Sequence, residues 1–162
     1  MAKRHTCTRR IEIDMGHRVP DHGSKCRNLH GHRYVIEATC SGPLASAGEQ
    51  SGMVVDFGFL KAAMVDSIDK RFDHRLCLWF LDPQLGVLFE LPETRDGRPV
   101  LLTEDQLGNA LTLIDRVPTA ENLAALWFEQ LDPMVESLTE GRAKLESIKV
   151  WETPNCWASY PA

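Results

Sequence analysis

The sequence of 162 residues has no Cys-x-x-Cys pair, although it contains five cysteines. Five is an odd number, and the cysteines lie far apart, at positions 7, 26, 40, 77 and 156. The spacing therefore indicates neither a disulfide framework nor a thiolate zinc finger. We expect the thiols to be reduced.

Long apolar runs are also missing. The longest, residues 76–81, is far shorter than the ~20 residues that a helix needs to cross a bilayer. Residues 1–5 lack the apolar core of a secretory signal. We therefore expect a cytoplasmic protein without a membrane partner.

The chain has no excess of basic charge either. Eighteen Lys and Arg residues stand against 23 Asp and Glu residues, which gives a net charge of −5, and the basic residues form no stripe. Proteins that bind nucleic acid usually carry a basic patch. The composition therefore predicts no nucleic-acid partner.

The apolar residues make up 43% of the chain, which suits one domain with a single core over residues 1–162. Alternating apolar positions predict strands over residues 11–17, 30–38 and 145–153. A segment at about residues 82–110 has the composition of an insertion. We expect it to form two further strands, residues 87–91 and 100–102.

Apolar residues at helical spacing predict two helices. Asp56 is a natural N-cap for the first, and its expected buried stripe is Phe57, Leu60, Met64, Ile68 and Phe72. Thr119 is a natural N-cap for the second, with an expected buried side of Leu123, Leu126 and Leu131.

Three histidines lie near the first two predicted strands. His30 and His32 are two positions apart, so in a strand their side chains project from the same face. If His17 comes from a neighbouring strand, three neutral imidazoles can hold a zinc ion and leave a coordination position open, as in catalytic zinc sites. A His-x-His triplet alone is also compatible with packing or surface histidines.

Several other polar residues have two readings. Cys26, shortly before His30, is either a thiol that moves a proton at the metal or an inert buried thiol. The Asp73-His74 doublet is either a charge pair at a helix C-terminus or an orienting carboxylate with a general base. Glu152 shares a predicted strand face with apolar residues, so it needs either a structural partner or a ligand with paired N–H donors.

In order along the chain, these motifs resemble the family of 6-pyruvoyltetrahydropterin and 6-carboxytetrahydropterin synthases. The blocks that carry the resemblance are His17-Arg18, Cys26, Leu29-His30-Gly31-His32, Gly52–Phe57, Asp73-His74-Arg75, Pro118–Asn122 and Trp151-Glu152-Thr153. The resemblance implies the tunnelling fold (T-fold), an α+β fold in which an antiparallel four-stranded sheet carries two helices on one face. It also implies that the sheets of several subunits join into an oligomeric barrel, usually a homohexamer of two trimers.

The resemblance implies roles for the site residues. The zinc ligands would be His17, His30 and His32. Cys26 would move a proton, and Asp73 with His74 would act as a relay across a subunit boundary. Glu152 would anchor the pterin ring by accepting two N–H groups. Glu121 matches an acidic residue of the Pro-Thr-x-Glu block, and it either contacts the substrate or complements the helix dipole.

The implied activity is that of a zinc-dependent lyase acting on 7,8-dihydroneopterin triphosphate. The compact Cys-x-x-x-His-x-His spacing is similar to that of bacterial 6-carboxytetrahydropterin synthases, which release acetaldehyde and triphosphate and feed queuosine and 7-deazapurine synthesis. The 6-pyruvoyltetrahydropterin synthases of biopterin synthesis are the alternative. A zinc- or pterin-binding module without turnover is an alternative of another class, and the presence of Cys26, Asp73 and His74 disfavours it.

Overall fold

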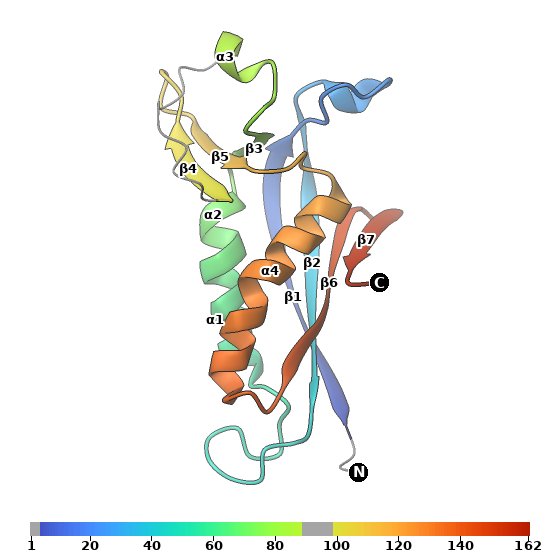
Figure 1. The fold of residues 1–162 in the computed structure, drawn as a ribbon, viewed down its shortest axis with the longest axis vertical. Coiled ribbons are helices and arrows are strands. Elements are labelled where there is room, and N and C mark those ends of the chain that lie inside the picture. Colours follow the sequence, from blue (N-terminus) through green and yellow to red (C-terminus); the bar gives the residue numbers. More distant parts are fainter. Residues whose placement is uncertain (1–3, 89–98) are drawn as a thin grey trace.

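The computed structural model describes residues 4–88 and 99–162. Its strands are β1 (His5–His17), β2 (His30–Gly42), β3 (Leu76–Trp79), β4 (Val100–Glu104), β5 (Ala110–Ile114), β6 (Lys144–Thr153) and β7 (Cys156–Tyr160). They form one sheet in the order β4-β5-β3-β1-β2-β6-β7. In Figure 1, β1 begins at the bottom of the sheet, and β7, the last strand, lies beside β6.

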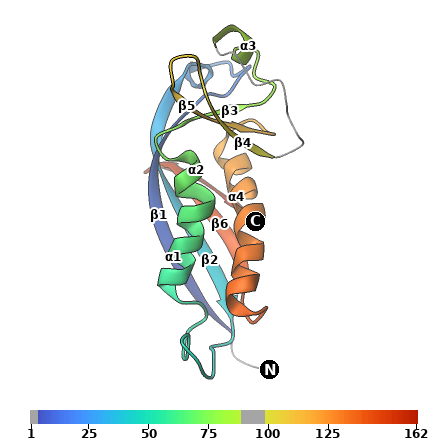
Figure 2. The same ribbon diagram turned by 90° about the vertical axis from the view of Figure 1, so that its left-hand side faces the viewer.

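Two long helical segments cover one face of this sheet. The first runs through α1 (Phe57–Met64), a π-helical stretch (Val65–Asp69) and α2 (Lys70–Phe72), and the second is α4 (Ala120–Thr139). Short helical turns lie at Lys25–Arg27 and at α3 (Leu85–Leu88). Figures 1 and 2 show α1 and α4 side by side on the same side of β1, β2 and β6. The expectation of two helices on one face is therefore confirmed.

Both predicted helix caps are present. The Asp56 side chain accepts hydrogen bonds from the N–H groups of Gly58 and Phe59, at 2.7 and 3.1 Å. The Thr119 hydroxyl accepts one from the N–H of Asn122 at 3.3 Å. Each bond satisfies a backbone donor that the helix itself leaves unpaired, so the sequence motif fixes where each helix begins.

The core lies between the sheet and the two helices. β1 pairs with β2 in antiparallel register, and β2 pairs with β6. Because side chains alternate across a strand, one face of this ribbon is apolar and the other is polar. The apolar face packs against the helices. Between the helices, Phe72 of α2 and Trp127 of α4 are in contact, with ring centroids 5.4 Å apart.

The expected sheet of four strands is too small, because the sheet has seven. β1, β2, β6 and β7 do form a four-stranded antiparallel unit. The other three strands extend it beyond β1, where β3 pairs in parallel with both β1 and β5. Of these short strands, β3 and β5 carry no alternation long enough to predict them.

The expected two-stranded excursion is only partly right. The predicted strand at residues 100–102 lies within β4, which pairs in antiparallel register with β5. Residues 87 and 88 belong to the short helix α3, and residues 89–91 lie outside the described residues. A short apolar run does not distinguish a strand from a helical turn, which explains the error.

One residue of the expected helix stripe is also misplaced. Leu60, Met64, Ile68 and Phe72 are buried, whereas Phe57 is 53% exposed. Phe57 is the first residue of α1 and so extends past the edge of the core. None of the helices in the described part of the chain is both long and apolar enough to cross a membrane.

Candidate metal centre

The three histidines meet at one end of the β1–β2 ribbon. His17 is paired directly with His30 in the strand register, and His32 is paired with Met15. All three side chains therefore project from the same face of the ribbon. Their ring centroids are 4.5 to 5.2 Å apart. The sequence prediction that they lie together is confirmed.

Backbone carbonyls fix two of the three rings. The Nδ1 of His17 lies 2.8 Å from the carbonyl oxygen of Pro118, and the Nδ1 of His30 lies 2.7 Å from that of Asn28. A carbonyl oxygen can only accept, so each Nδ1 donates. In the neutral ring, the lone pair is then on Nε2. In metal sites, a ligating histidine usually donates a hydrogen bond from its other ring nitrogen, and this bond fixes the orientation of the ring.

Burial favours the neutral form of two of the histidines, His17 and His32. Burial lowers the pKa of His17 to about 4. The hydrogen bond to Pro118 opposes this shift, and repulsion from His30 and His32 adds to it. Burial also lowers the pKa of His32, although the charge of Glu152 raises it. Among the described residues, the buried Nε2 atoms of His17 and His32 have no hydrogen-bond partner. Because its Nδ1 donates to Pro118, the Nε2 of His17 presents a lone pair, as a metal ligand requires.

Glu152 is the fourth member of the group. Its Oε1 lies 3.0 Å from the Nε2 of His32 and 3.7 Å from the Nε2 of His17. One ligand atom from each of the four residues lies within 4.8 Å of the others. Three imidazole nitrogens and a carboxylate oxygen are a donor set typical of zinc. The residues present therefore fit a zinc ion.

A pocket of about 700 Å³ opens beside this group. Its wall includes His32, Glu152, Trp151 and Glu37. Its volume falls within the roughly 300–1,000 Å³ that is usual for small-molecule sites. A ligand in this pocket can reach His32 and the Glu152 carboxylate.

Cys26 lies in the short helical turn that connects the two ligand strands. The turn is held by a hydrogen bond from the N–H of Val19 to the carbonyl oxygen of Cys26, at 2.9 Å. Its free thiol is half-buried. Cys26 is not one of the four clustered residues found in the described part of the chain. The structure therefore places Cys26 near His30 in the chain and outside the group of four clustered residues.

Asp73 and His74 form a separate pair. The Nδ1 of His74 donates to the Oδ2 of Asp73 at 2.6 Å, and this bond, reinforced by the charge of Asp73, raises the pKa of His74. The backbone of Asp14 holds both residues, because its N–H donates to Asp73 and its carbonyl oxygen accepts from the N–H of His74. His74 adopts a left-handed conformation, with a φ of 55°.

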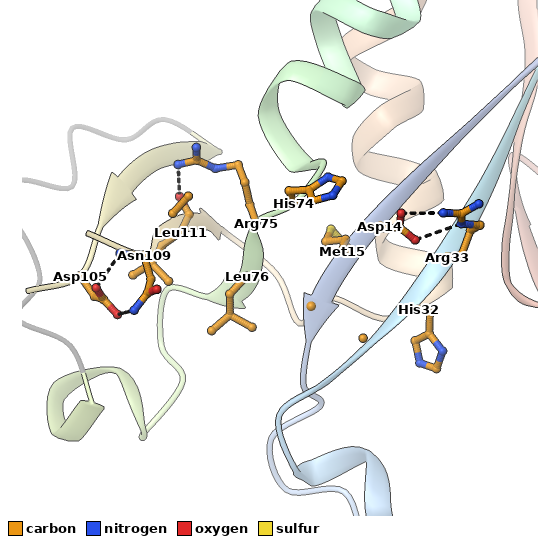
Figure 3. A pocket seen from close by; sticks show the side chains of 13 residues that line it. Asp14, Met15, His32, Arg33, His74, Arg75, Leu76, Asp105, Asn109 and Leu111 are labelled. Atoms are coloured by element: carbon orange, nitrogen blue, oxygen red, sulfur yellow. Dashed lines mark hydrogen bonds and ion pairs between the residues drawn. The ribbon is translucent and has the colours of Figure 1, made fainter. Parts of the chain in front are cut away.

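The Asp73–His74 pair does not join the four clustered residues. The His74 side chain is 78% exposed and lines a second pocket, of about 740 Å³. Figure 3 shows Asp14 paired with Arg33 in this pocket, while the ring of His32 points away from His74. Because its side chain is exposed, His74 is accessible to contact a second chain.

Glu121 lies in the first turn of α4 and is exposed. Its carboxylate has no hydrogen bond or ion pair to any residue in the ranges 4–88 and 99–162. The start of α4 is nevertheless close to the histidines, because Pro118 holds His17. Both readings of Glu121 are compatible with this position.

Two features of the site were not predicted. Tyr34 is fully buried with its ring 5.7 Å from those of His17 and His32, and its hydroxyl has no hydrogen-bond partner in the described chain. Arg18 forms a buried ion pair with Asp82, at 3.4 Å. The alternation from His30 through Tyr34 could have revealed the tyrosine. The ion pair joins residues far apart in the sequence and left no local signal.

Comparisons with known proteins identify relatives of this chain. The family model of 6-pyruvoyl tetrahydropterin synthase matches residues 6–162. A Rickettsia bellii protein named 6-carboxy-5,6,7,8-tetrahydropterin synthase is 37% identical over 151 residues, which are 93% of this chain and 96% of that protein. A Haemophilus influenzae protein of the same name is 29% identical over 154 residues, or 94% of this chain and 96% of that protein.

Solved structures share the fold. An uncharacterized protein from Wolinella succinogenes has a TM-score of 0.75 at 22% identity, covering 98% of each chain. The 6-pyruvoyl tetrahydropterin synthase of Caenorhabditis elegans has a TM-score of 0.60 at 24% identity, covering 99% of this chain and 97% of that one. The expected tunnelling fold is therefore confirmed.

Proposed function

The chain belongs to the 6-pyruvoyl tetrahydropterin synthase family, and we propose that it is a cytoplasmic, zinc-dependent 6-carboxy-5,6,7,8-tetrahydropterin synthase. Its substrate would be 7,8-dihydroneopterin triphosphate, and acetaldehyde and triphosphate would be released. The observation that carries the proposal is the convergence of His17, His30, His32 and Glu152, whose ligand atoms lie within 4.8 Å of one another. Relatives with this enzyme name at up to 37% identity support the carboxy branch.

Each site residue then has a task. His17, His30 and His32 hold the zinc ion, which acidifies hydroxyl groups that bind to it. Glu152, on the wall of the adjacent pocket, accepts the amino group and ring N–H of the pterin in a charge-assisted fork. Glu121, in the first turn of α4, would either contact the substrate or complement the helix dipole.

Cys26 would remove a proton from the pterin side chain. The helical turn that contains Cys26 lies in the connection between β1 and β2, the strands that carry the three histidines. The hydrogen bond to Asp73 raises the pKa of His74 and so favours the protonated form of the His74 ring. Since the pair lies outside the four clustered residues, we propose that it serves the site of a neighbouring subunit in a homohexamer of two trimers.

Product analysis tests this function. The zinc-loaded protein is incubated with 7,8-dihydroneopterin triphosphate, and acetaldehyde and the pterin product are measured. Equal amounts of acetaldehyde and 6-carboxytetrahydropterin support the proposal and a place in queuosine or 7-deazapurine synthesis. A 6-pyruvoyl product without acetaldehyde would assign the chain to the pyruvoyl branch, and tight pterin binding without turnover would make it a binding module.

A further inference from the structure

Residues 73–75 form the turn that carries the His74 ring. The N–H of His74 donates to the carbonyl oxygen of Asp14 at 2.7 Å, and the N–H of Gly16 donates to the carbonyl oxygen of Arg75 at 3.0 Å. These two bonds attach one side of the turn to the end of β1. Between them, the φ of His74 is 55°, a left-handed conformation that is strained for a residue with a side chain. The surrounding structure must therefore hold the turn in this conformation.

The Arg75 side chain attaches the other side of the turn to β4 and β5. Its Nε donates to the Thr112 hydroxyl at 3.0 Å, and its Nη2 donates to the carbonyl oxygens of Leu111, at 2.7 Å, and Thr103, at 3.0 Å. In Figure 3, the Arg75 side chain extends from the turn to Leu111, on the side away from the His74 ring. Arginine suits this position because its planar guanidinium presents several donors in a fixed fork.

Thr112 continues the link to the helix that precedes the turn. It is fully buried, and its hydroxyl, which accepts from Arg75, donates to the carbonyl oxygen of Arg71. Arg71 belongs to α2, which leads into the Asp73–His74 pair. The hydrogen bonds thus run from α2 through β5 and back to the turn. A network of satisfied hydrogen bonds of this kind makes the local structure rigid.

The His74 ring has little packing of its own to fix its direction. It is 78% exposed, and within the described chain its one hydrogen bond is to Asp73, the neighbouring residue of the same turn. The direction of the ring is therefore set by the turn. A movement of the turn would displace Asp73 and His74 together.

We propose that Arg75 is a positioning residue for the Asp73–His74 pair, with β4 and β5 as its support. This inference rests on the proposed function, in which the pair serves the site of a neighbouring subunit. A proton is transferred only between groups within hydrogen-bond reach, so a small displacement of His74 slows such a step. The strands β4 and β5 then contribute to turnover through His74.

A double-mutant cycle gives the first test. The values of kcat and KM are measured for the unmodified protein, Arg75→Gln, His74→Ala and the double variant. Arg75→Gln should lower kcat by at least about 10-fold with KM and zinc content unchanged, since a misplacement of about 1 Å can cost about 100-fold. In the His74→Ala background, Arg75→Gln should have no further effect on kcat, because the group that Arg75 positions is gone. Equal losses in both backgrounds would mean a general structural role and would overturn the inference.

Arg142→Gln is the matched control. Arg142 also joins separate segments by donating to two carbonyl oxygens, those of Pro43 and Met53, at 2.8 and 3.1 Å. Its replacement should lower the melting temperature, as that of Arg75 should, and leave kcat unchanged. A fall in kcat as large as that of Arg75→Gln would show that lost stability accounts for both effects, which would overturn the inference.

The pKa of His74 gives a readout that does not depend on turnover. The hydrogen bond to Asp73 raises this pKa above 6.5, the charge of Asp14 on β1 adds to the shift, and the charge of Arg33 on β2 opposes it. In an NMR titration, Arg75→Gln should bring the pKa of the His74 ring closer to 6.5, because the bond to Asp73 loosens when the turn moves. The control variant should keep the pKa of the unmodified protein.

The outcomes separate this inference from the function. An active unmodified protein in which Arg75→Gln changes neither kcat nor the pKa of His74 would overturn the inference and leave the proposed enzyme intact. Absence of turnover in the unmodified protein, with a His74 pKa that falls in Arg75→Gln, would refute the proposed function and still support the link between Arg75 and His74.

Discussion

Backbone carbonyls orient two of the three clustered histidines. The carbonyl oxygens of Pro118 and Asn28 each accept a hydrogen bond from a histidine Nδ1–H, which leaves the Nε2 atoms of His17 and His30 free to bind a metal ion. The two-residue spacing of His30 and His32 allowed their shared direction to be predicted. The partner of His17 could not be predicted, because 101 positions separate it from Pro118.

Cys26 should matter for rate and not for structure. If its thiol moves a proton, Cys26→Ala should lower turnover by roughly 10²–10⁴, the usual contribution of a positioned acid or base. Zinc content and melting temperature should stay near those of the unmodified protein. Cys156→Ala, which removes an exposed cysteine of β7, is the control and should change none of these. Steady-state kinetics with unchanged turnover in Cys26→Ala would refute the assignment.

His17 should make the metal-free protein sensitive to acid. Burial lowers its pKa from 6.5 to about 4, so between these pH values the unfolded chain binds a proton that the folded chain does not. The contribution of His17 to the free energy of unfolding is therefore fully present above pH 6.5. It is lost as the pH falls toward 4, and the loss amounts to about 3 kcal/mol. His32, whose pKa is also lowered, acts in the same direction.

Two measurements check this effect. Urea unfolding of the metal-free protein across this pH range should show the loss, and His17→Asn should reduce the slope. An NMR titration of the His17 ring in the folded, metal-free protein should give a pKa near 4. A pKa near 6.5 would contradict the burial of a neutral ring.

At the scale of elements, caps and apolar stripes are what the sequence determined well. Asp56 and Thr119 begin the helices as predicted, because side-chain caps act within three residues of the chain. The strands β3 and β5 were harder to predict, since their parallel pairing depends on partners far away in the sequence. Their place beside β1 is fixed by tertiary contacts such as those of Arg75, which bonds to Thr112 and to two carbonyls.

The Asp56 cap should have a measurable effect on stability. Asp56→Ala removes the acceptor of two helix N–H groups, and loss of such a cap costs about 1 kcal/mol. Asp66→Ala is the control, because it breaks only the exposed pair with Lys70, which is worth at most about 0.5 kcal/mol. Chemical denaturation of both variants compares the two free energies of unfolding. Equal losses would mean that the cap does not define the start of the helix.

At the scale of the whole molecule, the sheet has open edges. Within the described chain, β1 pairs with β3 only at Gly16 and His17, and β7 has β6 as its one neighbour. Unpaired strand edges tend to pair with another chain. The edges indicate assembly, while the number of subunits comes from the family resemblance and was not predictable from the strands.

We therefore expect an obligate oligomer, most simply a hexamer. Sedimentation equilibrium at micromolar concentration should show a species of six chains, and the exposed His74 should be protected in it. A stable and fully active monomer at these concentrations would contradict both the assembly and the role of the Asp73–His74 pair.

The most direct test of the account is the dependence of product formation on bound zinc. Metal-free protein is titrated with zinc in the presence of 7,8-dihydroneopterin triphosphate while acetaldehyde release is followed. We predict a linear increase in rate that stops at one zinc per chain and is absent in a His30→Ala/His32→Ala variant. Full acetaldehyde release without zinc, or none at one equivalent of zinc, would contradict the proposed metal centre and its chemistry.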